Sequence, residues 1–293
     1  MSPSLDWAHL QWHLDPVAIA IGPLAVRWYG LMYAVAISFT YWLTNRRLAK
    51  ESWEFTREHI DAFLTWLVLG ILLGGRLGYV FFYGWSYFSK HPMEIILPVS
   101  FQNGFHFTGI SGMSFHGGVL GVTAAFVGFA LANKRRPLRL AELMVPTIPL
   151  GYTFGRLGNF LNGELWGRPT DVAWGMYFPH DPLGDAFLGK VGPLRHPSQL
   201  YEAFGEGLFL WIILWSIKNR APFRGRMVSC YLMGYGMIRF FIEFTREPDA
   251  QVGFLFGTDW LTMGQLLCGV MVLAGMIFWL FPVRGNAPES VQA

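Results

Sequence analysis

The length of its apolar stretches constrains this chain most, because several are long enough to cross a lipid bilayer. A helix needs about 20 apolar residues to span the hydrocarbon core. Seven stretches meet this requirement, at about residues 18–43, 60–84, 115–133, 141–160, 200–217, 228–245 and 261–282. The sequence therefore predicts an all-α fold, a polytopic membrane helix bundle of seven transmembrane helices. We expect residues 1–293 to form a single integral membrane domain.

Composition supports this reading. Hydrophobic residues make up 53% of the chain and charged residues only 14%, whereas a soluble protein carries about 25% charged residues. The net charge of +3 says little about partners, and we expect no nucleic acid among them. Cys230 and Cys268 lie in apolar stretches, which favours packing roles over a disulfide or a metal site. No motif for a metal or a cofactor is present, and we expect none.

The basic residues outside the spans divide unequally between the two sides. Thirteen lie in the tail and in the loops after spans one, three and five: Arg46, Arg47, Lys50, Arg57, Lys134, Arg135, Arg136, Arg139, Lys218, Arg220, Arg224, Arg226 and Arg284. Five lie on the opposite side: Lys90, Arg168, Lys190, Arg195 and Arg246. The positive-inside rule therefore predicts an outer N-terminus and a cytoplasmic C-terminus.

Two predicted outer loops are long, at about residues 85–114 and 161–199. Both are rich in glycine, proline and aromatic residues. Function concentrates in loops held by a rigid scaffold. We therefore expect the working side of the protein to face outward.

Ionisable residues inside the predicted spans are the strongest functional signal. An arginine at the centre of a membrane helix costs at least about 2.5–3.5 kcal/mol on insertion scales. The spans nevertheless contain Arg27, Arg76, Arg156, Arg239, His116, Glu202, Glu206 and Glu243. With the predicted orientation, the four arginines and His116 all fall on the outer side of the bilayer.

These charges have two interpretations. In the first they pair internally: Arg239, Glu243 and Arg246 share a helix face, and Glu202 and Glu206 can pair with arginines across helices. In the second, several guanidinium groups surround an anion, because the planar fork of arginine matches a phosphate. The arginines outnumber the carboxylates available to them, which favours the second interpretation. In the outer leaflet the available anion is a phospholipid head group.

Two glycine-rich segments enter the spans at the same level. Residues 109–118 contain four glycines and carry His116. Such backbone is tolerated at membrane depth only where it lines protein or a cavity. We therefore expect His116 to have a catalytic or ligand-orienting role. Residues 155–167 place Asn159, Asn162 and Glu164 beside Arg156, and Pro146 and Pro149 upstream should bend that helix.

These segments resemble those of bacterial prolipoprotein diacylglyceryl transferases. The likeness covers nearly all seven spans and is most specific at residues 155–167. It runs through residues 28–33, 74–79, 112–118, 155–167, 196–202 and 239–251. The family is similar in having seven spans and an outer N-terminus. One departure is Ser111-Gly112, where relatives usually have Gly-Gly before Met-Ser-Phe-His.

The resemblance implies an enzyme of the bacterial inner membrane with a periplasmic N-terminus and a cytoplasmic C-terminus. Its reaction would move the diacylglyceryl group of phosphatidylglycerol to the lipobox cysteine thiol of a prolipoprotein signal peptide. Membrane lipids would be its other partners. The matching catalytic residues are Tyr29, His116, Arg156 and Arg239. The matching phosphatidylglycerol-binding residues are Arg156, Asn159, Glu164, Gly167, Arg239, Glu243 and Arg246.

The chemistry suits these residue types. A thiolate is the nucleophile, and a thiol of pKa about 8.5 is only slightly ionised at neutral pH. His116 is a base that could take the proton. Arg156 and Arg239 would stabilise the charge that develops on the leaving phosphate. The identity of the base is left open by the sequence.

Two other functions fit parts of the pattern. Residues 109–112 have the form G-x-S-G, which rhomboid-type intramembrane serine proteases combine with a histidine on a later span. Spans four to seven contain no histidine, and His180 and His196 lie in the outer loop. An anion or lipid transporter would also use intramembrane arginines, but it would not need His116. Incubation with phosphatidylglycerol and a lipobox peptide distinguishes the three functions.

The predicted sidedness can be tested by cysteine labelling. Single cysteines in the loops at 85–114 and 161–199 should react with an impermeant thiol reagent added to intact spheroplasts. Cysteines near Arg135 or Arg224 should react only after lysis, because the positive-inside rule places both in the cytoplasm. Labelling of the Arg135 loop from outside would invert the predicted topology.

Overall fold

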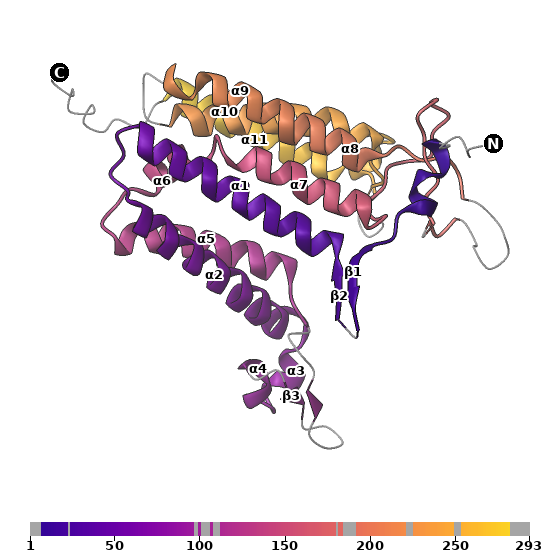
Figure 1. The fold of residues 1–293 in the computed structure, drawn as a ribbon, viewed down its shortest axis with the longest axis horizontal. Helices are drawn as coiled ribbons and strands as arrows, with labels where there is room; N and C mark the ends of the chain where they lie inside the picture. Colours follow the sequence, from indigo (N-terminus) through magenta and orange to yellow (C-terminus); the bar gives the residue numbers. More distant parts are fainter. Residues whose placement is uncertain are drawn as a thin grey trace. The chain divides into compact units, whose positions relative to one another are not determined.

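A computed structural model describes residues 7–22, 24–96, 99–100, 106–107, 112–179, 181–183, 192–220, 225–248 and 253–281. The chain forms two compact units. The first contains Met1–Arg47 and Ala141–Ala293, and the second contains Leu48–Leu140. Helices dominate both units (Figure 1), as predicted for an all-α membrane protein.

The first unit is a helix bundle preceded by a hairpin. It begins with a 3-10 helix η1 (Trp7–His13) and strands β1 (Val17–Ile21) and β2 (Leu24–Arg27). Its helices, some continuing past the unit's limits, are α1 (Trp28–Lys50), α6 (Pro137–Met144), α7 (Ile148–Leu161), α8 (Ser198–Glu202), α9 (Leu210–Ile217), α10 (Arg226–Ile242) and α11 (Met263–Leu280). A π-helical segment, η3 (Ala203–Phe209), joins α8 to α9. Shorter 3-10 turns are η4 (Lys218–Arg220), η5 (Glu243–Thr245) and η6 (Leu255–Gly257).

Close helix contacts hold this bundle together. Helix α1 packs along α7, where the rings of Phe39 and Phe154 stack with centroids 5.0 Å apart. A Cβ on Gly151 would lie 2.5 Å from the Thr40 hydroxyl, so only glycine allows this approach. Between α10 and α11, the Ser229 hydroxyl donates a hydrogen bond of 2.5 Å to the carbonyl of Gly275.

The second unit is built on a pair of helices, α2 (Arg57–Tyr83) and α5 (Phe115–Ala132). The short helices α3 (Trp85–Phe88) and α4 (Met93–Ile96) and the strands β3 (Val99–Ser100) and β4 (His106–Phe107) lie between them in sequence. Glycines of α2 face glycines of α5. A Cβ on Gly121 would lie 2.0 Å from the carbonyl oxygen of Gly70, which places the two backbones in contact.

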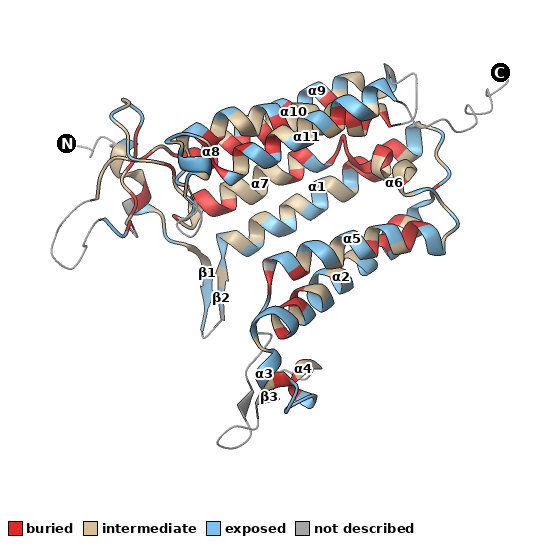
Figure 2. Ribbon diagram, turned by 180° about the vertical axis from the view of Figure 1, so that it is seen from behind, coloured by how far each residue is buried: buried red, intermediate tan, exposed pale blue. Residues whose placement is uncertain are grey.

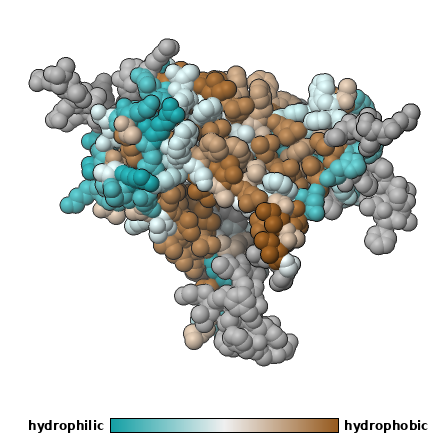
Figure 3. Space-filling model, viewed as in Figure 1, coloured by the Kyte–Doolittle hydropathy of each residue, from teal (hydrophilic) through white to brown (hydrophobic). Residues whose placement is uncertain are grey.

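The surface has the character of a membrane protein. Large apolar side chains are widely exposed along the helices, while several charged side chains are buried. Figure 2 shows exposed residues along the helices of both units. Apolar side chains cover most of the visible helix surface (Figure 3). Among the described residues, α2, the helix Ser198–Ile217 and α11 are long and apolar enough to cross a membrane. Residues 116–132 and 137–144 give a fourth span if counted as one, although the two helices are bent by 116°.

The other predicted spans correspond to α1, α7 and α10, which do not meet the same requirements of length and apolar composition. Helix α7 has only 14 residues and α10 has 17. The chain is thus a multi-pass membrane protein, and the number of seven spans stays a prediction.

The predicted start of the first span is wrong. Residues 17–27 form an antiparallel hairpin, with Ile19 opposite Val26 and Ile21 opposite Leu24. The alternating β-branched residues of β1 favour a strand. Gly22 has a left-handed φ of +58° and precedes a proline, which together favour a turn over a helix. Arg27 therefore ends a strand and does not lie within a helix.

Two other predicted regions differ in detail. The bend expected from Pro146 and Pro149 is a break between α6 and α7 at residues 145–147. The loop at 85–114 contains short helices and strands, and the loop at 161–199 is held partly by isolated bridges at Gly167, Pro169 and Met176. Several residues named in the sequence analysis lie outside the described residues: Gly109, Ile110, Ser111, His180, Lys190, Arg224, Gln251 and Arg284.

The glycine contact between α2 and α5 predicts a loss of stability for one substitution and no such loss for its neighbour. Gly121→Ala should destabilise the protein by about 1–3 kcal/mol, because the new methyl group meets backbone that has no way to move aside. Gly118→Ala is the control, since its Cβ would meet nothing within 4 Å. The midpoint of thermal unfolding in detergent measures both effects. Equal midpoints for the two variants would contradict the packing.

Candidate functional site

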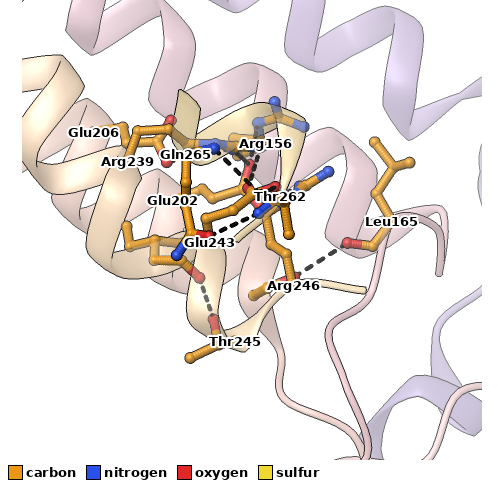
Figure 4. Close-up of polar contacts among 12 residues, drawn as sticks. Arg156, Leu165, Glu202, Glu206, Arg239, Glu243, Thr245, Arg246, Thr262 and Gln265 are labelled. Carbon is orange, nitrogen blue, oxygen red and sulfur yellow. Dashed lines mark hydrogen bonds and ion pairs between the residues drawn. The ribbon is translucent and has the colours of Figure 1, made fainter. Parts of the chain in front are cut away.

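A cluster of charged side chains lies in the first unit where α7, α8, η3 and α10 meet (Figure 4). Three guanidinium groups and three carboxylates form ion pairs there. They belong to Arg156, Arg239, Arg246, Glu202, Glu206 and Glu243. Their elements are far apart in sequence, so the bundle itself assembles the cluster.

Glu202 is the centre of this cluster. Its side chain has no exposed surface. One carboxylate oxygen lies 2.8 Å from Arg156 Nε and 3.0 Å from Arg239 Nη1. The other accepts a hydrogen bond of 2.5 Å from Arg246 Nη1. One buried carboxylate therefore contacts all three arginines.

Glu206 extends the cluster toward α7. Its carboxylate lies 3.3 Å from Arg239 Nη1 and accepts a hydrogen bond of 2.7 Å from the Tyr152 hydroxyl. Tyr152 in turn accepts a hydrogen bond of 2.7 Å from Arg156 Nε. The π-helical segment η3 can approach α7 this closely because residue 207 is glycine: a Cβ there would lie 2.1 Å from the Thr153 hydroxyl. Such segments are frequent at functional sites.

Glu243 is the third carboxylate of the cluster and contacts Arg239 and Arg246. Its Oε2 lies 3.1 Å from Arg239 Nη2 and 3.3 Å from Arg246 Nε, so the predicted Arg–Glu–Arg pairing is present. The prediction of one shared helix face is wrong for Arg246, because α10 ends at Ile242 and Arg246 has an extended backbone. Glu243 Oε1 accepts a hydrogen bond of 3.1 Å from the hydroxyl of Thr262, the N-cap of α11. The partial positive charge at a helix N-terminus favours a carboxylate there.

A polar chain leads from Arg156 into the loop after α7. Arg156 Nη1 donates to Asn159 Oδ1 at 3.2 Å, and Asn159 Nδ2 donates to Glu164 Oε1 at 2.9 Å. Gly167 lies beside Arg246 in an isolated bridge. A Cβ on Gly167 would lie 2.3 Å from the carbonyl oxygen of Thr245, so no other residue fits there.

The structure thus brings together seven of the nine predicted site residues: Arg156, Asn159, Glu164, Gly167, Arg239, Glu243 and Arg246. Tyr29 lies on α1, with its Cα near Gly158 of α7 and its hydroxyl 3.1 Å from that of Tyr33. His116 belongs to the second unit, where it is exposed in the first turn of α5 behind the N-cap Ser114.

Arg76 also belongs to the second unit. Its guanidinium donates to the carbonyls of Ile95 at 2.9 Å and Glu94 at 2.5 Å, and it lies over the ring of Phe88. These contacts tie the short helix α4 to α2. They give Arg76 a structural role, which is the first of the two interpretations of the intramembrane charges.

The predicted excess of arginines over carboxylates is wrong for the cluster itself. Three guanidinium groups face three carboxylates there, because Glu202 and Glu206 pair across helices. An anion must then bind through donors that the ion pairs leave open. Among the described residues, the Nη2 atoms of Arg156 and Arg246 have no such partner. Both side chains are partly exposed, at 19% and 17%.

The sequence analysis missed two arginines that build the site from the loops. Arg168 donates to the carbonyl of Arg246 at 2.5 Å. Arg195 is 3% exposed and pairs with Asp181 and, at 2.7 Å, with Glu247. Burial opposes its charge, but the hydrogen bonds to Asp181 and Glu247 hold the pKa of Arg195 above its usual value. In sequence both resemble ordinary loop arginines, and no spacing marks them.

His196 lies in the same loop region. Its ring nitrogen Nδ1 is 3.2 Å from the Tyr201 hydroxyl. Burial lowers the pKa of His196 below its usual value, because it disfavours the charged form of the ring. The neighbouring serine, Ser198, donates its hydroxyl hydrogen to the carbonyl of Leu165 at 3.2 Å and makes no contact with His196 through that group.

Comparisons with known proteins place the chain in one family. The family model for prolipoprotein diacylglyceryl transferase matches residues 16–281. The chain is similar to the phosphatidylglycerol–prolipoprotein diacylglyceryl transferase of Chlorobaculum tepidum, with 49% identity over 92% of this chain and 90% of that protein. It is also similar to the proteins of the same name from Aliivibrio fischeri, at 45% identity over 96% and 94% of the two chains, and from Pseudoalteromonas translucida, at 45% over 92% and 93%.

The central position of Glu202 predicts a large effect of its neutralisation. Glu202→Gln should destabilise the protein by roughly 3–5 kcal/mol, because three largely desolvated arginines, 14–19% exposed, would then share two carboxylates. Glu54→Gln is the matched control, since its pair with Arg135 is 35% exposed on each side and such pairs contribute about 0–1 kcal/mol. Thermal unfolding in detergent compares the two. A loss for Glu202→Gln no greater than for the control would remove Glu202 from the centre.

Proposed function

Because the chain belongs to the prolipoprotein diacylglyceryl transferase family, we propose that it transfers the diacylglyceryl group of phosphatidylglycerol to prolipoproteins. The family match covers most of the chain, and the relatives of that name align over nearly its whole length. The chain is therefore a membrane-bound transferase of lipoprotein biosynthesis. A transporter or an intramembrane protease is not favoured.

The acceptor in this proposal is the thiol of the lipobox cysteine in the signal peptide. The thiol gives up its proton, and its sulfur forms a bond to the terminal glyceryl carbon of the lipid. The bond between that carbon and the phosphate oxygen breaks at the same time. The products are a thioether-linked diacylglyceryl protein and glycerol phosphate, so the step balances without a further co-reactant.

One observation supports the placement of the phosphate most directly. The ion pairs around Glu202 fix Arg156 and Arg246, yet the Nη2 atom of each has no partner among the described residues. A phosphodiester that accepts these two donors would sit at the partly exposed edge of the cluster. Donors that are already oriented stabilise the charge of the leaving phosphate without reorganisation.

The remaining predicted residues have supporting roles in the proposal. Arg239 contacts Glu202, Glu206 and Glu243, so it offsets their negative charge behind the phosphate. Tyr29, on α1 with its Cα near Gly158 of α7, would line the site from α1. His116, exposed at the start of α5, is the proposed acceptor of the thiol proton.

We also propose that the enzyme lies in the bacterial inner membrane and works at its outer leaflet, among the membrane lipids. The thirteen-to-five division of basic residues supports a periplasmic N-terminus, a cytoplasmic C-terminus and seven spans. Residues 1–293 would form one integral membrane domain with outer loops at about 85–114 and 161–199. An exported signal peptide would then meet the site on the side where its thiol emerges.

The proposal predicts lipid transfer that depends on Arg156. The purified protein in micelles of phosphatidylglycerol should add a diacylglyceryl mass to a synthetic lipobox peptide. Arg156→Ala should lower the rate about 100-fold or more, and Arg156→Lys should also be slow because it loses the planar fork. Arg46→Ala, an exposed arginine at the far end of α1, is the control. Mass spectrometry of the peptide gives the rates.

Three results would oppose the proposal. A cleaved peptide would indicate a protease, and an unchanged peptide with the parent protein would leave transport as the better function. Transfer at the parental rate by Arg156→Ala, at equal protein concentration, would place the phosphate elsewhere.

A further inference from the structure

The backbone of the site contains one residue in an unfavourable conformation. Leu165 has a left-handed φ of +60°, which non-glycine residues seldom adopt. Its side chain is 49% exposed, so burial of the leucine does not offset the strain. Gly163, two residues earlier, also has a positive φ, of +66°, but glycine adopts it readily. The strain at Leu165 must therefore be balanced by contacts of its backbone.

Two side chains at the start of α8 supply these contacts. Gln199 Nε2 donates a hydrogen bond of 2.7 Å to the carbonyl of Glu164, and the Ser198 hydroxyl donates one of 3.2 Å to the carbonyl of Leu165 (Figure 4 labels Leu165). Both side chains belong to fully buried residues. The two carbonyls on either side of the strained φ are thus held by adjacent residues of one helix.

Gln199 is specialised for this contact. Its Oε1 is buried and has no hydrogen-bond partner among the described residues. An unsatisfied buried acceptor is costly, so the amide is retained at a cost to stability. We attribute this amide to the hydrogen bond that its Nε2 donates to the carbonyl of Glu164.

The backbone of Glu164 and Leu165, held by Ser198 and Gln199, sets the orientation of Asn159 and Arg156. The Glu164 carboxylate faces Asn159 Nδ2 at 2.9 Å. An ionised carboxylate only accepts hydrogen bonds, so the amide of Asn159 must turn its NH₂ toward Glu164 and its oxygen toward Arg156. That oxygen accepts from Arg156 Nη1 at 3.2 Å. Arg156 Nη2 then has no partner among the described residues, and the side chain is 19% exposed.

We propose that Gln199 and Ser198 are positioning residues for phosphodiester binding. They hold Leu165 in the left-handed conformation, and through Glu164 and Asn159 they aim the guanidinium of Arg156. This inference rests on the proposed function, because the phosphodiester is that of phosphatidylglycerol. It gives a role to residues 198 and 199, which the transfer reaction itself does not use.

The test combines loss of the hydrogen bond with relief of the strain. Gln199→Met keeps the length of the side chain but removes the donor, so kcat/KM for phosphatidylglycerol should fall about tenfold or more. Leu165→Gly adopts the same φ without strain. The double variant Leu165→Gly with Gln199→Met should therefore recover to within about threefold of Leu165→Gly alone. Such non-additivity is the sign of a shared role.

Gln11 provides a matched control. Its Nε2 donates a hydrogen bond of 2.8 Å to the carbonyl of Phe160, and the residue is 3% exposed. It is therefore also a buried amide bound to a backbone carbonyl in the same unit. Any loss caused by Gln11→Met should persist in the Leu165→Gly background, because Gln11 does not hold the strained residue.

The outcomes separate this inference from the proposed function. Parental kcat/KM for Gln199→Met, or a loss equally large with and without Leu165→Gly, would overturn the positioning role while transfer by the parent protein still stands. Absence of transfer by the parent protein would overturn the proposed function instead. Ser198→Ala, a smaller change, carries the same test if Gln199→Met does not accumulate as folded protein.

Discussion

The contact on which the site depends is the buried carboxylate of Glu202 between the guanidinium groups of Arg156, Arg239 and Arg246. Charges in a membrane protein are costly unless they are paired within the bundle. Glu202 meets this requirement for three arginines at once, which come from α7, α10 and the segment after η5. The same contact fixes where each guanidinium points. A loosely paired arginine would have to reorganise before it bound an anion, whereas these are already held.

Much of the surrounding structure makes this contact possible. Gly207 lets the π-helical segment approach α7, and Gly167 lets the loop approach the backbone of Thr245. The N-terminus of α11 supports Glu243 through Thr262. In the loops, Arg195 joins Asp181, Glu247 and the carbonyl of Gly167. In the cluster three guanidinium groups face three carboxylates, and among the described residues the Nη2 atoms of Arg156 and Arg246 have no partner, which suits an anionic head group that enters from the lipid.

The sequence predicted those features that depend on local spacing or on apolar length. The helices agree with the predicted stretches within a few residues for most of the chain, and the pairing of Arg239 with Glu243 follows from their spacing at the end of α10. The pairing of Glu243 with Arg246 was also predicted, although Arg246 lies in extended backbone after the helix. The hairpin at residues 17–27 was missed because an apolar stretch of alternating β-branched residues also satisfies a count of apolar residues.

Pairing across helices was harder to predict. From the sequence, Glu202 and Glu206 were only possible partners of the arginines. Their burial among three guanidinium groups is visible only in the folded chain. Nor does any pattern reveal that Arg76 binds backbone carbonyls of α4, or that Leu165 is strained. These features depend on which backbones meet in the folded chain.

A structure with bound phosphatidylglycerol would test the proposed phosphate site most directly. We expect the lipid phosphate in that structure at about 3 Å from Nη2 of Arg156 and of Arg246, with Glu202 still paired to all three arginines. A phosphate that displaces Glu202, or that binds away from both arginines, would contradict it.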